Sequence, residues 1–316
     1  MSTLRTVFFG TAGLACPSLS ALAQSSGFEL AAVVTQPDKP KGRNLTLQPS
    51  PVRILATQKG LPVLQPERAR SETFFQELAP LRPDLIVVVA YGQILPGQIL
   101  DLPRFGCLNV HASLLPKYRG AAPIQWAILN DEEETGVTLM KLDPGLDTGA
   151  ILTRQATPID ADDDAQTLHD RLAAIGAELL LKTIPDYVAG KILPSKQPQE
   201  GAGYARKLTK EDGRLDWNQP ARALWNRVRA FVPWPGAYTF LSAESKPQLL
   251  KVWQAEVAGE SRGLPGEILE AGKNGIVVAC GQQSLRILVL QREGGRHLSA
   301  RDFLAGHPLT PGQRLS

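Results

Sequence analysis

Three polar side chains in two short segments have the chemistry needed for transfer of an acyl group. Asn109 and His111 lie two residues apart in "CLNVHAS" (107–113), so on a strand they point to the same face. Asp143 and Asp147 lie in "DPGLDTGAIL" (143–152), where a proline and two glycines predict a tight bend. An amide can donate to a developing oxyanion, and a carboxylate beside an imidazole favours its charged form. Asn109, His111 and one of the two aspartates, Asp143 or Asp147, are therefore a candidate set for acyl-type transfer.

Spacing leaves other interpretations of these segments open. Asp143 and Asp147 could cap the backbone of their own turn, and a strand end can hold an amide and an imidazole as satisfied polar groups. Cys107 could be a nucleophile or a packed cysteine, because apolar residues flank it. The sequence has no GxSxG elbow, P-loop or zinc-type spacing that would indicate a different chemistry.

The elements that must position these residues alternate as in an α/β layer. Strands are predicted over 5–10, 28–35, 61–64, 84–92, 107–113 and 135–142, and helices over 16–24, 71–80, 123–130 and 162–184. A further helix begins at Pro51 and stops at Gly60, and Pro185 is expected to kink or end the last one. The alternation predicts a Rossmann-like, mostly parallel sheet, which binds ligands beyond the carboxyl ends of its strands.

A second domain is indicated by a change in pattern after the last of these helices. Residues 191–206 are rich in Pro, Gly, Gln and Ser and are predicted to be a linker. Short strands follow at 238–241, 249–257, 276–280 and 284–290, which is typical of a small all-β, OB-like barrel. We predict a catalytic domain over 1–190, the linker over 191–206, and a C-terminal barrel over 207–316.

Charge is distributed unevenly between the two parts. Residues 1–205 hold 18 Lys and Arg against 21 Asp and Glu, a net of −3, and residues 206–316 hold 16 against 10, a net of +6. A basic domain suits a polyanionic partner, although a solvated basic surface explains the count equally well. The start "MSTLRTVFFG" lacks the features of a secretory signal, no apolar run is long enough to span a membrane, and three scattered cysteines favour a reducing cytoplasm.

Four segments together resemble the methionyl-tRNA formyltransferase family. "LNVHASLLPKYRGAAPIQWAI" resembles its folate-site signature, and "ETGVTLMKLDPGLDTGAIL" is similar to its second signature. "TQPDKPKGRNLTLQPSPV" is similar to its long basic loop, and "GYARKLTKEDGRLDW" extends the resemblance into the C-terminal domain. The resemblance covers essentially the whole chain and implies the formyltransferase fold.

The resemblance also implies a reaction and the residues for it. A formyl group passes from 10-formyltetrahydrofolate, a cosubstrate, to the amino group of methionine on initiator tRNA, with no metal. Asn109, His111 and Asp147 match the catalytic trio. The tetrahydrofolate-binding stretch corresponds to Ser113, Leu114, Leu115 and Pro116, and residues 87–96 are expected to line the same pocket. The candidate tRNA contacts are Lys39, Lys41, Arg43, Lys207, Lys210, Arg222, Arg227 and Arg229.

Several functions compete with this interpretation. A formyltransferase of the same superfamily could act on glycinamide ribonucleotide or a sugar amine, although a small substrate has less need for a basic loop and barrel. A hydrolase could release formate, with water replacing the amine. An RNA-binding module with a degenerate α/β domain would bind tRNA but no folate. The expected protein is a cytoplasmic, monomeric enzyme.

Overall fold

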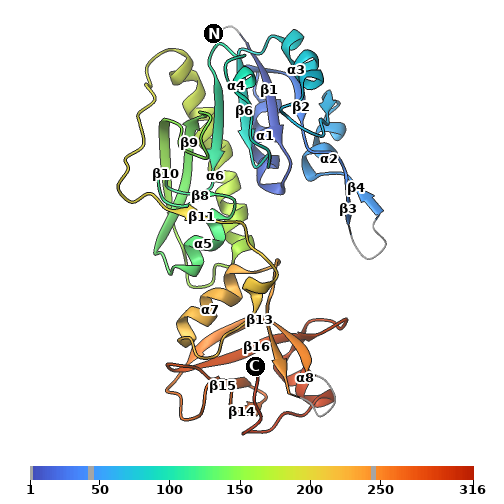
Figure 1. The fold of residues 1–316 in the computed structure, drawn as a ribbon, viewed down its shortest axis with the longest axis vertical. Coiled ribbons are helices and arrows are strands. Elements are labelled where there is room, and N and C mark those ends of the chain that lie inside the picture. Colours follow the sequence, from blue (N-terminus) through green and yellow to red (C-terminus); the bar gives the residue numbers. More distant parts are fainter. Residues whose placement is uncertain (1–2, 42–45, 243–246) are drawn as a thin grey trace. The chain divides into compact units, whose positions relative to one another are not determined.

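The computed structural model describes residues 3–41, 46–242 and 247–316, without the side chain of Lys41. The chain divides into two compact units (Figure 1). Unit 1 comprises Met1–Pro123, Glu134–Pro158 and His169–Arg206, and unit 2 comprises Ile124–Glu133, Ile159–Leu168 and Lys207–Ser316. Across the described ranges, every helix is too short or too polar to span a bilayer.

Unit 1 is built on a seven-stranded sheet with the order β10-β9-β7-β6-β1-β2-β5. Its strands are β1 (Leu4–Gly10), β2 (Phe28–Val34), β5 (Val63–Leu64), β6 (Leu85–Val89), β7 (Cys107–His111), β9 (Glu134–Lys141) and β10 (Ile151–Pro158). The first five pair in parallel, whereas β9 runs antiparallel to β7 and β10 antiparallel to β9. All residues of β6 and β7 are buried, as in the centre of a covered sheet. The predicted α/β class is confirmed, and β10 is an additional edge strand.

Helices connect and cover these strands (Figure 1). They are α1 (Cys16–Gln24), α2 (Pro51–Gln58), α3 (Glu72–Leu78), α4 (Gly97–Leu100) and α6 (Ala165–Val188) from His169 on, with 3₁₀ turns η1 (Gly13–Ala15) and η2 (Ala79–Leu81). Helix α5 (Pro123–Leu129) belongs to unit 2 from Ile124 on. The predicted start of α2 is confirmed, because the Ser50 hydroxyl caps it by accepting from the Arg53 N–H at 3.0 Å.

The sequence predicts that Pro185 kinks or ends α6, and the second alternative is wrong, because the helix continues through Pro185 to Val188. Pro185 removes one backbone donor, but tertiary contacts hold the last turn in place. Ile184 is fully buried, and the Tyr187 hydroxyl donates to the Phe105 carbonyl at 2.8 Å. Packing therefore outweighs the local preference of the proline.

Two segments in which the sequence predicts no strand contain short paired strands. In the basic loop, β3 (Lys39–Lys41) pairs antiparallel with β4 (Thr46–Gln48), so the loop is a hairpin over its described residues. In the predicted linker, β11 (Tyr204–Ala205) pairs in parallel with β8 (Arg119–Gly120), in the segment that follows β7. Residues 191–206 therefore contact unit 1 and belong to it.

Unit 2 is an antiparallel sheet with the order β12-β13-β16-β15-β14, and β17 pairs with β16. Its elements are η3 (Glu211–Gly213), α7 (Ala221–Ala230), β12 (Ala237–Leu241), β13 (Gln248–Ala258), β14 (Ile268–Gly272), β15 (Gly275–Ala279), β16 (Ser284–Arg292), β17 (Leu298–Ser299) and α8 (Ala300–Gly306). The chain end bridges both edges of the sheet, since Leu315 pairs with Leu241 and Arg314 with Glu267. The predicted small all-β domain is confirmed.

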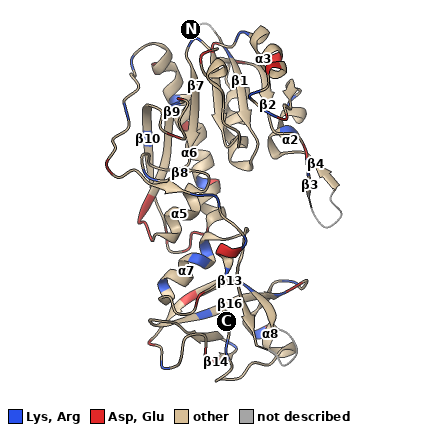
Figure 2. Cartoon of the chain, in the orientation of Figure 1, with Lys and Arg blue, Asp and Glu red and all other residues tan. Residues whose placement is uncertain are grey.

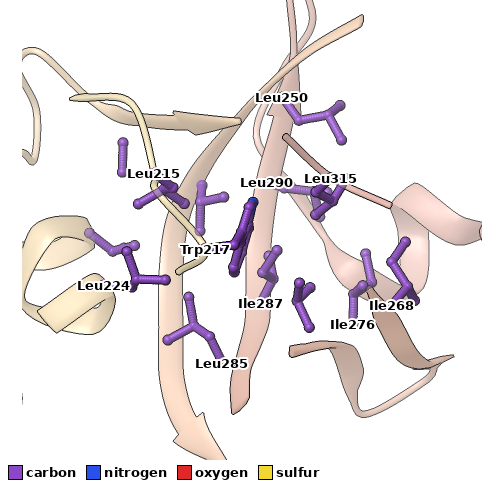
Figure 3. Packing of buried hydrophobic residues seen from close by; sticks show 14 of the residues in the cluster. Leu215, Trp217, Leu224, Leu250, Ile268, Ile276, Leu285, Ile287, Leu290 and Leu315 are labelled. Atoms are coloured by element: carbon purple, nitrogen blue, oxygen red, sulfur yellow. The ribbon is translucent and has the colours of Figure 1, made fainter. Parts of the chain in front are cut away.

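The core of unit 2 is apolar and centred on Trp217 (Figure 3). The indole is 4% exposed, packs among aliphatic side chains such as Leu224 and Ile287, and donates its N–H to the Thr239 hydroxyl at 3.0 Å. This buried polar group is therefore satisfied, and the unit has a core of its own.

Candidate active site

A cavity of about 530 Å³ lies in unit 1 beside the ends of β6 and β7. Val88 and residues 90–95 line one side, within the segment 87–96 that is predicted to line the folate pocket. Tyr91 is 2% exposed, and burial raises the pKa of its phenol to about 12, so it contributes a neutral ring to the wall. The volume and mostly apolar lining are typical of a small-molecule binding site.

Strand β7 presents Asn109 and His111 to this cavity. Both line it, and they are 8% and 7% exposed. The intervening Val110 faces α6, where Gly176 approaches it so closely that a β-carbon would lie 2.7 Å from the valine side chain. Alternation along a buried strand therefore places the polar pair on the face opposite α6.

The two nitrogens of His111 have different surroundings. Nε2 lies 2.9 Å from the Tyr118 carbonyl, which can only accept, so this nitrogen is the donor of that bond. Nδ1 lies 3.8 Å from Oδ2 of Asp147. The nitrogen that can exchange a proton is therefore Nδ1, which faces the carboxylate.

Asp147 reaches the imidazole from the loop after β9. Its φ is +53°, in the left-handed region that aspartate tolerates better than most residues. Its Oδ2 accepts a hydrogen bond from the Gly120 N–H at 2.8 Å, and its side chain is 14% exposed. Asn109, His111 and Asp147 thus line one cavity together.

The structure places Ser113, Leu114, Leu115 and Pro116 away from the cavity wall, and none of these four described residues lines it. The Ser113 hydroxyl donates to the Lys117 carbonyl at 2.7 Å, and Leu115 is buried against Met140. The Thr138 hydroxyl donates to the Ser113 carbonyl at 2.6 Å and accepts from the Leu115 N–H at 3.0 Å. These contacts stabilise the loop itself, and the assignment of the four residues to tetrahydrofolate binding stays a prediction.

Cys107 is a packed residue. It is 1% exposed, and its Sγ lies 3.6 Å from the Ile99 carbonyl. Burial raises the pKa of the thiol to about 12, so almost no thiolate exists at neutral pH. The nucleophile interpretation is therefore disfavoured.

The predicted tRNA contacts have varied environments. Lys39, Lys207 and Lys210 are exposed, and Lys39 Nζ donates to the Gln36 side chain at 2.5 Å. Arg43 lies outside the described residues, and for Lys41 only the backbone is described.

The three arginines of α7, a helix with conspicuous basic residues in Figure 2, are engaged within unit 2. Arg222 forms hydrogen bonds of 2.8–3.1 Å with the Asp131 carboxylate. Arg227 donates to the Asp212 carbonyl, and Arg229 is 8% exposed and donates to two backbone carbonyls. Each of the three thus has a partner within unit 2, while the Arg222 side chain is still 54% exposed, and their assignment to tRNA binding stays a prediction.

Two residues of the site lie in the segment predicted to be a linker. Tyr204 lines the cavity, and Gln197 is 4% exposed and bonds to the loop of Asp147. A glutamine or tyrosine among Pro, Gly and Ser carries no periodic signal, so residue pattern offered no means of finding them. Within the described ranges, no group of three or more His, Cys, Asp or Glu side chains forms a possible metal site.

Comparisons with known proteins define the class. The family described as "Formyl transferase" matches residues 4–184, and "Formyl transferase, C-terminal domain" matches residues 207–308. Two solved structures share the fold. An N-formyltransferase from Helicobacter canadensis, in complex with folinic acid and dTDP-3-aminofucose, has a TM-score of 0.64 at 20% identity, covering 90% of this chain and 99% of that one. HypX from Aquifex aeolicus with tetrahydrofolic acid has a TM-score of 0.62 at 18% identity, covering 96% and 47%. The chain is a formyltransferase.

Curated relatives give the particular family. The methionyl-tRNA formyltransferase of Citrifermentans bemidjiense is 52% identical over 315 residues, covering 100% of this chain and 97% of the relative. That of Caldanaerobacter subterraneus is 50% identical and covers 99% and 100%, and that of Myxococcus xanthus is 49% identical and covers 99% and 98%. The chain therefore belongs to the methionyl-tRNA formyltransferase family.

Proposed function

We propose that this chain transfers the formyl group of 10-formyltetrahydrofolate to the amino group of methionine on initiator tRNA, producing N-formylmethionyl-tRNA for translation initiation. The observation that carries the proposal is the meeting of Asn109, His111 and Asp147 at one cavity. The full-length similarity to methionyl-tRNA formyltransferases supports the choice of substrates. The enzyme acts as a monomer in the cytoplasm.

Each member of the trio has a distinct role in this reaction. The free amine attacks the formyl carbon, Asn109 donates to the formyl oxygen, and protonated His111 stabilises the oxyanion that forms. Because Nε2 of His111 is held by the Tyr118 carbonyl, Nδ1 is the nitrogen near which negative charge develops. Asp147 orients the imidazole, and through a water molecule it takes the proton that the amine loses. Collapse of the intermediate breaks the bond to N10 of the folate, and N10 gains a proton.

The cavity provides the folate site. The apolar side chains of Val88, Leu95 and Leu100 would contact the pterin, and the backbone of residues 90–94 offers polar groups at the rim. Ser113, Leu114, Leu115 and Pro116 support this site by fixing the loop after β7. Their effect on folate binding is indirect, since their side chains do not line the cavity.

The tRNA-binding residues are proposed from charge and position in the sequence. Lys39, Lys41 and Arg43 belong to the basic loop of the sequence, and Lys207 and Lys210 lie at the start of residues 207–316, which hold 15 Lys and Arg against 10 Asp and Glu. Exposed lysines release counterions when they contact phosphates, so each contact contributes to the salt dependence of binding.

The test is a formyl-transfer assay with 10-formyltetrahydrofolate and methionyl initiator tRNA. Uncharged initiator tRNA and methionyl elongator tRNA are the controls, and both should be poor acceptors. Efficient transfer to glycinamide ribonucleotide or a sugar amine instead would contradict the proposed acceptor. Release of formate at the same rate without any amine would contradict transferase activity.

A further inference from the structure

The loop that carries Asp147 begins beside the first residues of β7, whereas His111 lies at the other end of that strand. Since β9 is antiparallel to β7, its last residue Lys141 pairs with Leu108, whereas His111 pairs with Thr138. Leu108 and His111 are three residues apart, about 10 Å along a strand. The loop must therefore fold back over the sheet by this distance to bring the Asp147 carboxylate to 3.8 Å from Nδ1 of His111.

The backbone of this loop is tightly constrained at Asp147 and Gly149. A β-carbon on Gly149 would lie 1.9 Å from the Lys141 carbonyl oxygen, so only glycine fits there. Asp147 itself is in the left-handed region, with φ +53°. Such a conformation persists only where surrounding groups determine it.

The buried carboxamide of Gln197 holds this loop. Its Nε2 donates to the carbonyls of Asp147 and Gly149, both at 2.8 Å. Its Oε1 accepts from Nε and Nη2 of Arg119, at 3.0 and 2.7 Å. The next residue, Gly120, donates its N–H to the Asp147 carboxylate at 2.8 Å. Gln197 thus links the backbone of Asp147 to β8, the strand whose Gly120 binds the Asp147 carboxylate.

We infer that Gln197 is a positioning residue that sets Asp147 against His111, an inference that rests on the proposed role of Asp147. Gln197 does not line the cavity and is buried beneath the loop, so its effect passes through Asp147. A misplacement of about 1 Å at a reacting group can lower a rate about 100-fold. The geometry therefore predicts a loss in kcat with little change in folate binding.

The diagnostic variant is Gln197→Glu, which keeps the size of the side chain. A carboxylate can still accept from Arg119, but it presents oxygen to the carbonyls of Asp147 and Gly149 and repels them. We expect kcat to fall by about 10- to 100-fold, with the KM for 10-formyltetrahydrofolate within about 3-fold. The matched control is Gln199→Glu, an exposed position on the same segment, which should keep wild-type kinetics.

A double-mutant cycle separates positioning from a general structural defect. In the background of Asp147→Asn, the effect of Gln197→Glu on kcat should shrink to less than about 3-fold, because coupled residues are non-additive. Gln197→Leu, which introduces no charge, is the second variant if Gln197→Glu does not fold, and the same coupling is expected. Equal losses in both backgrounds, or wild-type kcat in a folded Gln197 variant, would overturn the inference. Wild-type turnover by Asp147→Asn alone would instead refute the proposed role of Asp147.

Discussion

Replacement of Asp147 by asparagine removes a charge while leaving the shape of the site unchanged. Asparagine tolerates the φ of +53° as well as aspartate does, and its side-chain oxygen can still accept the hydrogen bond from Gly120. The loop is also held through its backbone by Gln197. Two contributions of the carboxylate are therefore lost: its capacity to take the amine's proton through water, and its interaction with the imidazolium of His111.

The size of this interaction follows from the distance between the two groups. For unit charges 3.8 Å apart, Coulomb's law gives about 4 kcal/mol at an effective dielectric constant of about 20. A change of roughly 1.4 kcal/mol in the activation free energy corresponds to a factor of ten in rate. Because the Asp147 side chain is 14% exposed and partly screened, we expect kcat to fall by about 10²–10³-fold, somewhat below the full Coulombic limit.

Single-turnover formyl transfer at saturating tRNA and folate measures the chemical step for this variant. The melting temperature and the folate affinity of Asp147→Asn should match those of the wild type, since its packing is retained. If folded Asp147→Asn keeps more than about a tenth of wild-type turnover, the carboxylate does not stabilise the charged imidazole and the reasoning fails.

Three further outcomes are expected from other parts of the site. Asn109→Ala should fold normally and lose about 10²–10³ in kcat, as for removal of an oxyanion donor, and a loss confined to KM would contradict that role. Cys107→Ala should keep near-wild-type kcat, and the native thiol should resist alkylation at pH 7 because burial raises its pKa to about 12; rapid alkylation of the folded protein would show that the site is open. The double replacement of Lys207 and Lys210 by alanine should weaken tRNA binding and lower its salt dependence, so an unchanged salt slope would exclude both lysines as phosphate contacts.

The placement of Asn109 and His111 on one face of β7 could be predicted, because the sequence patterns that indicate it are local. The apolar run of β7 and its period of two place Asn109 and His111 on one face, and alternation with helices indicates the parallel sheet. The Gly- and Pro-rich loop correctly suggests that Asp147 is presented on a bend. The resemblance to a known family added the substrates and joined the three residues into one site.

The remaining features depend on contacts between segments distant in the sequence. Nothing local indicates that the loop of Asp147 folds back over the sheet, since this follows from the antiparallel pairing of β9 and β7. The continuation of α6 through Pro185 depends on tertiary packing. The segment 191–206 has the composition of a linker, but Gln197 and β11 make it part of unit 1.

The pairing of β11 with β8 determines where the smallest catalytically competent fragment must end. A fragment cut after α6, at residue 190, retains the sheet and the trio but lacks the strand that supports Arg119 and Gly120. It also loses Tyr204 from the rim of the cavity. The stretch that leads into the C-terminal domain is thus an integral part of unit 1, and a fragment meant to keep the cavity intact must extend to Arg206.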